Sequence, residues 1–244
     1  MRKILAASIA ALVAAAGTTA ALAAQAPGGS MKVTVSPSQA GTKKHPRNAR
    51  LKLTIKNDDH SLTADKLTIF VAKNVRLTPA GLKFCSAKQI TTDKSKCPKL
   101  SRAGSGTAHA IAGVNNPPGV PLTFNVTSFL IGKATIGFYL EQQGGAIKVL
   151  AKGTLSSVSG RFGKKITVAI PSIARQFPPG VYNGLVDLTT SLSLRSGKHF
   201  LISTNGCPAN NEWPFKATIH FQPNPNPPPK SSITVIGAAA CTRA

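Results

Sequence analysis

The chain has 244 residues and is strongly basic, with 30 Lys and Arg residues against seven Asp and Glu and a formal charge of +23. Its 21 Gly and 18 Pro residues are close to ordinary frequencies, which excludes a collagen-like or compositionally disordered chain. The length suffices for one large all-β domain or for two smaller ones.

Residues 1–23 have the features of an export signal. Residues 1–3 carry two positive charges, residues 4–23 carry none, and Ala21-Leu22-Ala23 fits a small-x-small cleavage pattern. We expect cleavage after Ala23 and a secreted, extracellular protein whose formal charge falls from +23 to +21 with the loss of Arg2 and Lys3. The alternative is a retained membrane anchor, because about twenty apolar residues can span a bilayer. No second such run follows, so we expect no integral membrane segment after cleavage.

The rest of the chain is a series of short alternating or β-branched runs separated by Gly, Pro and Asn. Lys-Leu-Thr-Ile-Lys at 52–56 is an example of the alternation that is typical of a half-buried strand. Candidate strands are residues 32–36, 51–55, 66–71, 107–111, 122–129, 134–140, 147–155, 165–170, 181–192, 200–203, 213–221 and 231–235. We expect a turn at Gly104-Ser105-Gly106 and no helix outside the signal.

Many short strands between turns predict an all-β, antiparallel β-sandwich, immunoglobulin-like or jelly-roll-like. Residues 24–30 are expected to form a flexible lead. Residues 31–244 are expected to form a single domain, the alternative being two packed β subdomains. The proline-rich residues 223–229 are expected to form a loop.

Four cysteines lie beyond the signal, and an even number in an exported chain predicts two disulfides. Cys85 and Cys97 are close in sequence, within a turn-rich stretch. Cys207 and Cys241 flank a predicted hairpin, residues 213–221 and 231–235, whose outer ends must meet. We therefore expect the pairs Cys85–Cys97 and Cys207–Cys241. The absence of a Cys-x-x-Cys pair speaks against zinc, and we expect no metal or other cofactor.

Three sets of residues form a pattern along the chain. The first set runs from Lys83-Phe84-Cys85 through Lys96-Cys97-Pro98 to residues 101–108. The second joins Ala169-Ile170-Pro171, Gly180-Val181-Tyr182 and Leu185-Val186-Asp187. The third joins residues 203–208, Trp213-Pro214-Phe215-Lys216 and Cys241. Together they resemble a group of secreted, disulfide-containing β-rich proteins of high-GC Gram-positive bacteria, for which no activity is known. The resemblance covers most of residues 31–241 and implies no ligand.

The sequence shows few features that are typical of an enzyme, and we expect a protein without catalytic residues. It has five His and seven acidic residues, and it lacks Gly-x-Ser-x-Gly, His-Glu-x-x-His and a P-loop. Asp58-Asp59-His60 has the composition of a solvated turn. Asp187 lies in an apolar run, where it either points outward or is buried beside Lys or Arg. Trp213 is expected to cap the core near Cys207, which leaves few aromatic side chains for a sugar site.

Positive charge is concentrated in two stretches, which are the candidate polyanion-binding sites. Their chosen residues are Lys43, Lys44, Arg47, Arg50 and Lys52 in the first and Lys94, Lys96 and Lys99 in the second. Lysine is a flexible point charge, whereas specific reading of bases favours arginine, so we expect no sequence-specific nucleic-acid binding. The expected partner is an anionic cell-wall polymer or membrane surface, bound weakly. The alternative is a protein–protein interaction or carbohydrate-binding module.

Overall fold

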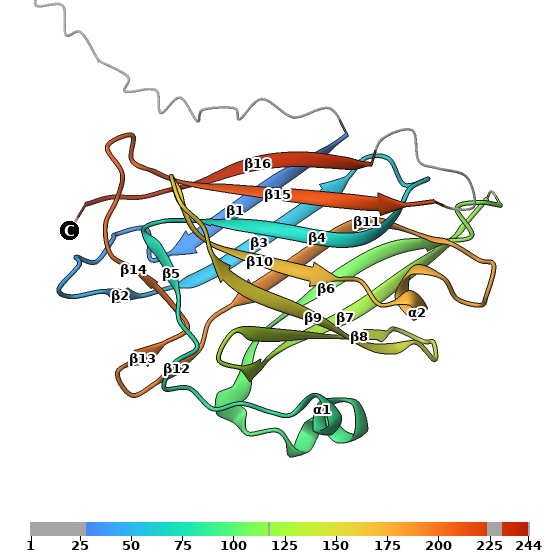
Figure 1. The fold of residues 1–244 in the computed structure, drawn as a ribbon, viewed down its shortest axis with the longest axis horizontal. Helices are drawn as coiled ribbons and strands as arrows, with labels where there is room; N and C mark the ends of the chain where they lie inside the picture. Colours follow the sequence, from blue (N-terminus) through green and yellow to red (C-terminus); the bar gives the residue numbers. More distant parts are fainter. Residues whose placement is uncertain (1–27, 117, 224–230, 244) are drawn as a thin grey trace, which may run out of the picture.

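The computed structural model describes residues 28–116, 118–223 and 231–243 (Figure 1). Most of this part of the chain forms one antiparallel sheet of eleven strands. Its strands are β1 (Gly29–Ser36), β3 (Arg50–Asn57), β4 (Thr63–Ala72), β6 (Arg102–Ala112), β7 (Val120–Gly132), β8 (Thr135–Gln142), β9 (Lys148–Ser157), β10 (Phe162–Ala169), β11 (Asn183–Leu192), β15 (Glu212–Gln222) and β16 (Ser232–Ala240). The all-β antiparallel fold is confirmed, and each of the twelve predicted runs contains or overlaps a strand.

The sheet curls until its two ends meet. The strand order is β1-β3-β11-β6-β7-β8-β9-β10-β4-β15-β16. The two end strands, β1 and β16, lie against each other without forming a hydrogen-bonded ladder. Their close approach uses Gly237, where an added Cβ would lie 2.8 Å from the carbonyl oxygen of Met31. The sandwich is therefore one continuous sheet folded over on itself as a nearly closed barrel, instead of two separate sheets (Figure 1).

Alternation along the strands places apolar side chains inside this barrel. In β15 every second residue from Trp213 to Phe221 is buried, and β3 and β16 show the same period of two. The largest fully buried side chains include Trp213, Phe215, Leu51 and Leu53, which come from β15 and β3. The lysines and arginines of the same strands consequently face outward.

Within the described residues, five short strands lie outside the large sheet. They are β2 (Arg47–Asn48), β5 (Val75–Leu77), β12 (Arg195–Ser196), β13 (His199–Phe200) and β14 (Ile202–Thr204). β14 lies between β2 and β5 in a three-stranded sheet, and β12 pairs with β13. Strands of two or three residues are too short to show an alternating pattern in the sequence. The sequence predicted a strand in only one of these places, residues 200–203, and the structure divides that stretch between β13 and β14.

The expectation that no helix lies beyond the signal is wrong. The helical segments are α1 (Ala87–Asp93), η1 (Lys94–Lys96), η2 (Lys99–Ser101) and α2 (Ser172–Arg175), η1 and η2 being 3₁₀ turns. α1 starts where the hydroxyl of Ser86 accepts a hydrogen bond from the Gln89 amide at 3.1 Å, and it buries only Ile90. Helices this short bury too few residues to leave a helical period in the sequence.

Two further local expectations are corrected. Gly104-Ser105-Gly106 is not a turn but part of β6. A Cβ at Gly104 would lie 1.8 Å from the carbonyl oxygen of Ser191, and one at Gly106 2.0 Å from that of Thr189, so these glycines let β11 approach β6. β1 begins at Gly29, inside the expected flexible lead of residues 24–30. The expected signal and most of the proline-rich loop lie outside the described residues.

Both predicted disulfides are present. The Cα atoms of Cys85 and Cys97 are 5.4 Å apart, and those of Cys207 and Cys241 are 5.7 Å apart. The second pair joins the outer ends of the β15–β16 hairpin, as its sequence position predicts. Two disulfides indicate an oxidising, extracellular type of environment. None of the helices in the described part of the chain is both long and apolar enough to cross a membrane.

Candidate functional site: a basic outer face

Seven exposed cations form what we call the basic stripe, which runs from the β1–β3 connection along the outer face of β1 and β3. Its members are Lys32, Lys43, Lys44, Arg47, Arg50, Lys52 and Lys56. The structure therefore brings together the first set of predicted polyanion-binding residues, Lys43 to Lys52, and extends it to Lys32 and Lys56.

The stripe results from the alternation of β3. Arg50, Lys52 and Lys56 are exposed, whereas the residues between them, Leu51, Leu53 and Ile55, are buried in the barrel. Residues two apart on a strand lie about 7 Å from each other on the same face. On β1, Lys32 stands opposite Thr54, which separates Lys52 from Lys56 on β3. Cations thus follow one another along two neighbouring strands.

Among the described residues no member of the stripe forms an ion pair, although Asp187 on β11 stands opposite Lys56 in the ladder with β3. Within residues 28–116, 118–223 and 231–243 the ion pairs are Lys94–Glu141, Lys96–Asp93 and His109–Asp187, none of which involves a member of the stripe. Arg47 donates a hydrogen bond to the side-chain oxygen of Gln39, an uncharged partner. The seven cations are exposed and free of ion pairs within this part of the chain, and Lys56 is the one with an acidic residue opposite it on the neighbouring strand.

The second predicted set, Lys94, Lys96 and Lys99, lies around α1, which stands well apart from β2 in the view of Figure 1. Lys94 pairs with Glu141 and lies 5.3 Å from the ring centre of Tyr139. Partial burial, with the nearby charges of Arg102 and Lys148, lowers its pKa. Lys96 is 3.8 Å from Asp93, whose pKa is lowered by hydrogen bonds from the side chain and backbone of Ser95. Two of these three lysines thus have acidic partners.

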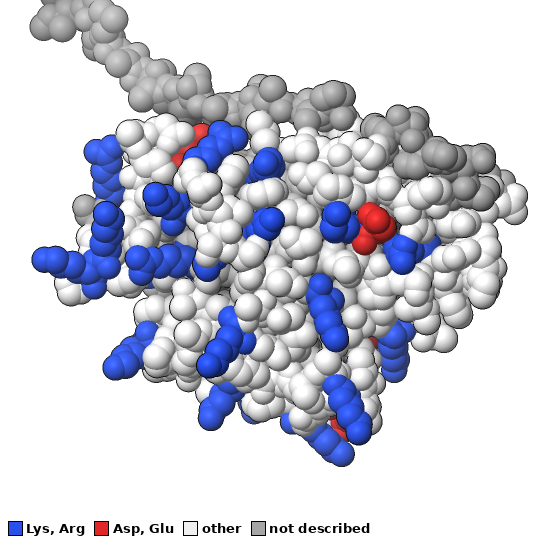
Figure 2. Space-filling model, in the orientation of Figure 1, with Lys and Arg blue, Asp and Glu red and all other residues white. Residues whose placement is uncertain are grey.

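Other cations are scattered over the barrel. Figure 2 shows Lys and Arg side chains across one face, with acidic side chains at only a few points. Lys216 lies 4.1 Å from the ring centre of Phe70, an arrangement that holds the ammonium group against the barrel wall. His220 stands opposite Lys66, and burial together with that lysine lowers its pKa. His220 is consequently neutral at neutral pH and adds no charge there.

The structure joins Asp187 to a histidine that the sequence did not pair with it. Asp187 points outward from β11, and its Oδ1 lies 2.8 Å from Nδ1 of His109 on β6. A hydrolytic triad would also require a hydroxyl or thiol hydrogen-bonded to the imidazole. Among the hydrogen bonds of the described residues, the His109 ring has only the one to Asp187. The pair consequently bridges two strands.

The cluster Asp58-Asp59-His60 lies in the connection between β3 and β4. Asp59 accepts hydrogen bonds from the amide and hydroxyl of Ser61, at 3.3 and 2.6 Å, which is the pattern of an Asx turn. Over the described ranges there is no group of three or more His, Cys, Asp or Glu side chains that could hold a metal ion.

Trp213 is fully buried, and its indole nitrogen donates a 2.8 Å hydrogen bond to the carbonyl oxygen of Gly206 beside Cys207. The prediction that it caps the core near this disulfide is confirmed. Because its ring faces the interior, Trp213 does not offer a stacking surface to a sugar.

Comparison with known proteins finds no matching family model, no matching curated protein and no matching solved structure.

Proposed function

We propose that the chain is an exported, non-catalytic protein that binds anionic polymers of the cell surface through the basic stripe. The observation that carries this proposal is the presence of seven exposed cations on β1, on β3 and in the connection between these strands, none in an ion pair within the described residues. The signal-like residues 1–23 and the two disulfides support export.

The stripe favours a polymer over a membrane surface. Proteins that lie on membranes usually add apolar side chains to their basic residues. The large apolar side chains exposed in the described part are Leu100, Val120, Ile173, Phe177 and Ile236, and none belongs to β1, β3 or the connection between them. Five of the seven cations are lysines, which meet phosphate or carboxylate groups as flexible point charges. Such binding is weak, diffuse and sensitive to salt.

The test compares two variants with equal net charge. In the stripe variant Lys43, Lys44, Arg47, Arg50 and Lys52 are changed to Gln. In the dispersed variant five exposed lysines elsewhere, Lys73, Lys133, Lys148, Lys152 and Lys198, are changed to Gln. Binding to purified cell-wall polymer is measured by co-sedimentation at increasing salt, and vesicles with anionic lipid form a parallel arm.

We expect wild-type affinity for the polymer to fall at least about tenfold between roughly 0.05 and 0.5 M salt, because counterions released on binding must be taken up again. The stripe variant should lose most of its binding at low salt, and the dispersed variant should keep most of it. Equal losses in both variants would refute a role for the stripe itself. Binding that ignores salt would refute the electrostatic proposal and favour a protein–protein interaction module. Stronger binding to vesicles than to polymer would make the membrane surface the partner.

A further inference from the structure

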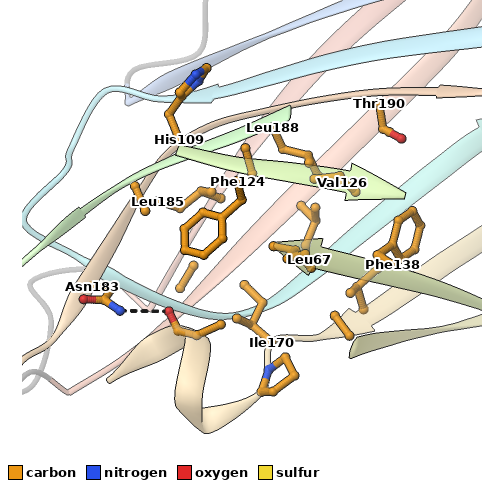
Figure 3. A pocket seen from close by; sticks show the side chains of 18 of the residues that line it. Leu67, His109, Phe124, Val126, Phe138, Ile170, Asn183, Leu185, Leu188 and Thr190 are labelled. Carbon is orange, nitrogen blue, oxygen red and sulfur yellow. Dashed lines mark hydrogen bonds between the residues drawn. The ribbon is translucent and has the colours of Figure 1, made fainter. Parts of the chain in front are cut away.

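An apolar pocket lies inside the barrel, and none of its lining residues belongs to the basic stripe. It has a volume of about 100 Å³ and is lined by side chains of β4 and of β6 to β11, together with the residues just before and within α2. Figure 3 shows Asn183 beside α2 at one end of the pocket and Thr190 at the other, with Phe124 and Leu67 between them. Strands β1, β3, β15 and β16 do not contribute to its wall.

The pocket exists because small residues occupy inward positions on this side of the barrel. Six of its lining residues are alanine or glycine: Ala64, Ala108, Ala110, Ala151, Ala174 and Gly184. The other side of the barrel interior is filled by large side chains such as Trp213, Phe215 and Leu53. Interiors of proteins are normally packed without voids of this size, so the use of alanine from four elements around one point calls for an occupant.

Two buried polar atoms in the pocket wall have no hydrogen-bond partner within the described residues. They are the hydroxyl of Thr190, a residue 2% exposed, and Oδ1 of Asn183, a residue 4% exposed. The amide nitrogen of Asn183 donates to the carbonyl oxygen of Ala174 at 3.1 Å, so this side chain is half satisfied. A buried polar group without a partner destabilises the folded protein, because the group has lost its hydrogen bonds to water. The Thr190 hydroxyl thus marks the place where a ligand could supply a hydrogen bond.

None of the described residues that line the pocket offers it a charged group to match an ionic ligand. His109 is the one titratable residue in its lining, and its ring is hydrogen-bonded to Asp187 on the outside of the barrel. Figure 3 shows this ring directed away from the other lining side chains. A charged ligand buried here would lose its hydration without compensation. The occupant should therefore be neutral.

We infer that this pocket binds a small neutral apolar molecule with a single hydroxyl group, of about the size of one aromatic ring, whose hydroxyl meets Thr190. Small apolar cavities of roughly this order accept benzene in other proteins, which sets the scale. The proposal is independent of polymer binding, because the pocket faces the interior and shares no residue with the basic stripe.

Phenol and toluene are the probes, because they match closely in shape and only phenol has a hydroxyl. Binding to the full-length wild-type protein is followed by NMR of the methyl groups of Leu67, Val126 and Leu188, which line the pocket. Both probes should shift these methyl signals. In Thr190→Val, which is nearly isosteric, phenol affinity should fall about tenfold because a buried hydrogen bond is lost, and toluene affinity should be unchanged or rise.

Filling the pocket provides a second test. Ala108→Leu and Ala151→Leu place extra carbon atoms in the pocket from different strands, and Ala238→Leu makes the same change on the outer face of β16. We expect the two pocket variants to lose both probes and the control to keep both.

Absence of methyl shifts with either probe in the wild type would overturn the pocket as a binding site and leave a packing void or buried water. Equal losses of phenol and toluene in Thr190→Val, or no loss of phenol, would overturn the role of the hydroxyl. If Ala108→Leu fails to fold, the comparison of Ala151→Leu with the control decides the question, and the Thr190→Val comparison stands separately.

Discussion

Replacement of Trp213 by Ala should lower the free energy of unfolding by about 3–5 kcal/mol, the range for truncation of a large aromatic side chain in a core. Trp213 is the bulkiest of the fully buried side chains. It also donates the 2.8 Å hydrogen bond to Gly206, which ties the residues before Cys207 to β15. The variant would leave a large cavity and an unpaired carbonyl oxygen in the same place. Chemical denaturation followed by far-UV circular dichroism measures the change, since the variant has no tryptophan to report by fluorescence.

Trp213→Phe separates the two contributions. Phenylalanine keeps most of the apolar contact but lacks the indole N–H. The free energy of unfolding of Trp213→Phe should therefore lie between those of the wild type and Trp213→Ala. A loss below about 1 kcal/mol in Trp213→Ala would contradict the position of this ring in the core. Equal losses in the two variants would show that the hydrogen bond to Gly206, and not the buried volume, carries the effect.

The strands could be predicted from the sequence because each large strand has one buried face. β15 and β3 carry their apolar residues at every second position, and that pattern survives in the sequence without knowledge of any partner. The order of the strands could not be predicted. β11 lies between β3 and β6, which are distant from it in sequence, and the meeting of β1 with β16 depends on the accumulated twist of the whole sheet.

The candidate sites likewise include some that local sequence predicts and others that depend on how distant strands pair. Outward lysines and arginines on β3 could be located because their alternation with Leu51, Leu53 and Ile55 is local. The contact between His109 and Asp187 spans 78 residues of sequence and depends on the register of β6 against β11, including a shift between Leu185 and Asp187. The interior pocket is less accessible still to sequence reasoning. An alanine in a strand does not by itself indicate a cavity, because the side chains that face it across the barrel decide whether the space is filled.

Loss of the Cys207–Cys241 disulfide should destabilise the protein more than loss of Cys85–Cys97. The loops closed by the two bonds span 34 and 12 residues. If the bonds act by restricting the unfolded chain, loops of these lengths correspond to about 3.8 and about 2.8 kcal/mol. The double variants Cys207→Ala/Cys241→Ala and Cys85→Ala/Cys97→Ala, compared by chemical denaturation, measure the difference.

The positions of the two disulfides in the fold should increase the difference between the two losses of stability. The Cys85–Cys97 disulfide encloses α1, a short helical segment outside the sheet. This segment can unfold locally while the sheet stays intact. Cys207–Cys241 holds the open end of the β15–β16 hairpin, and the chain beyond it is fixed by hydrogen bonds of Thr242 with Ser38 and Ala40. β16 is the strand that meets β1, so freeing its end should also weaken the closure of the barrel. Hydrogen exchange should therefore accelerate in β16 and β1 in Cys207→Ala/Cys241→Ala. In Cys85→Ala/Cys97→Ala it should accelerate around α1. A larger loss of stability without Cys85–Cys97 would contradict both the loop-length argument and the role given to β16.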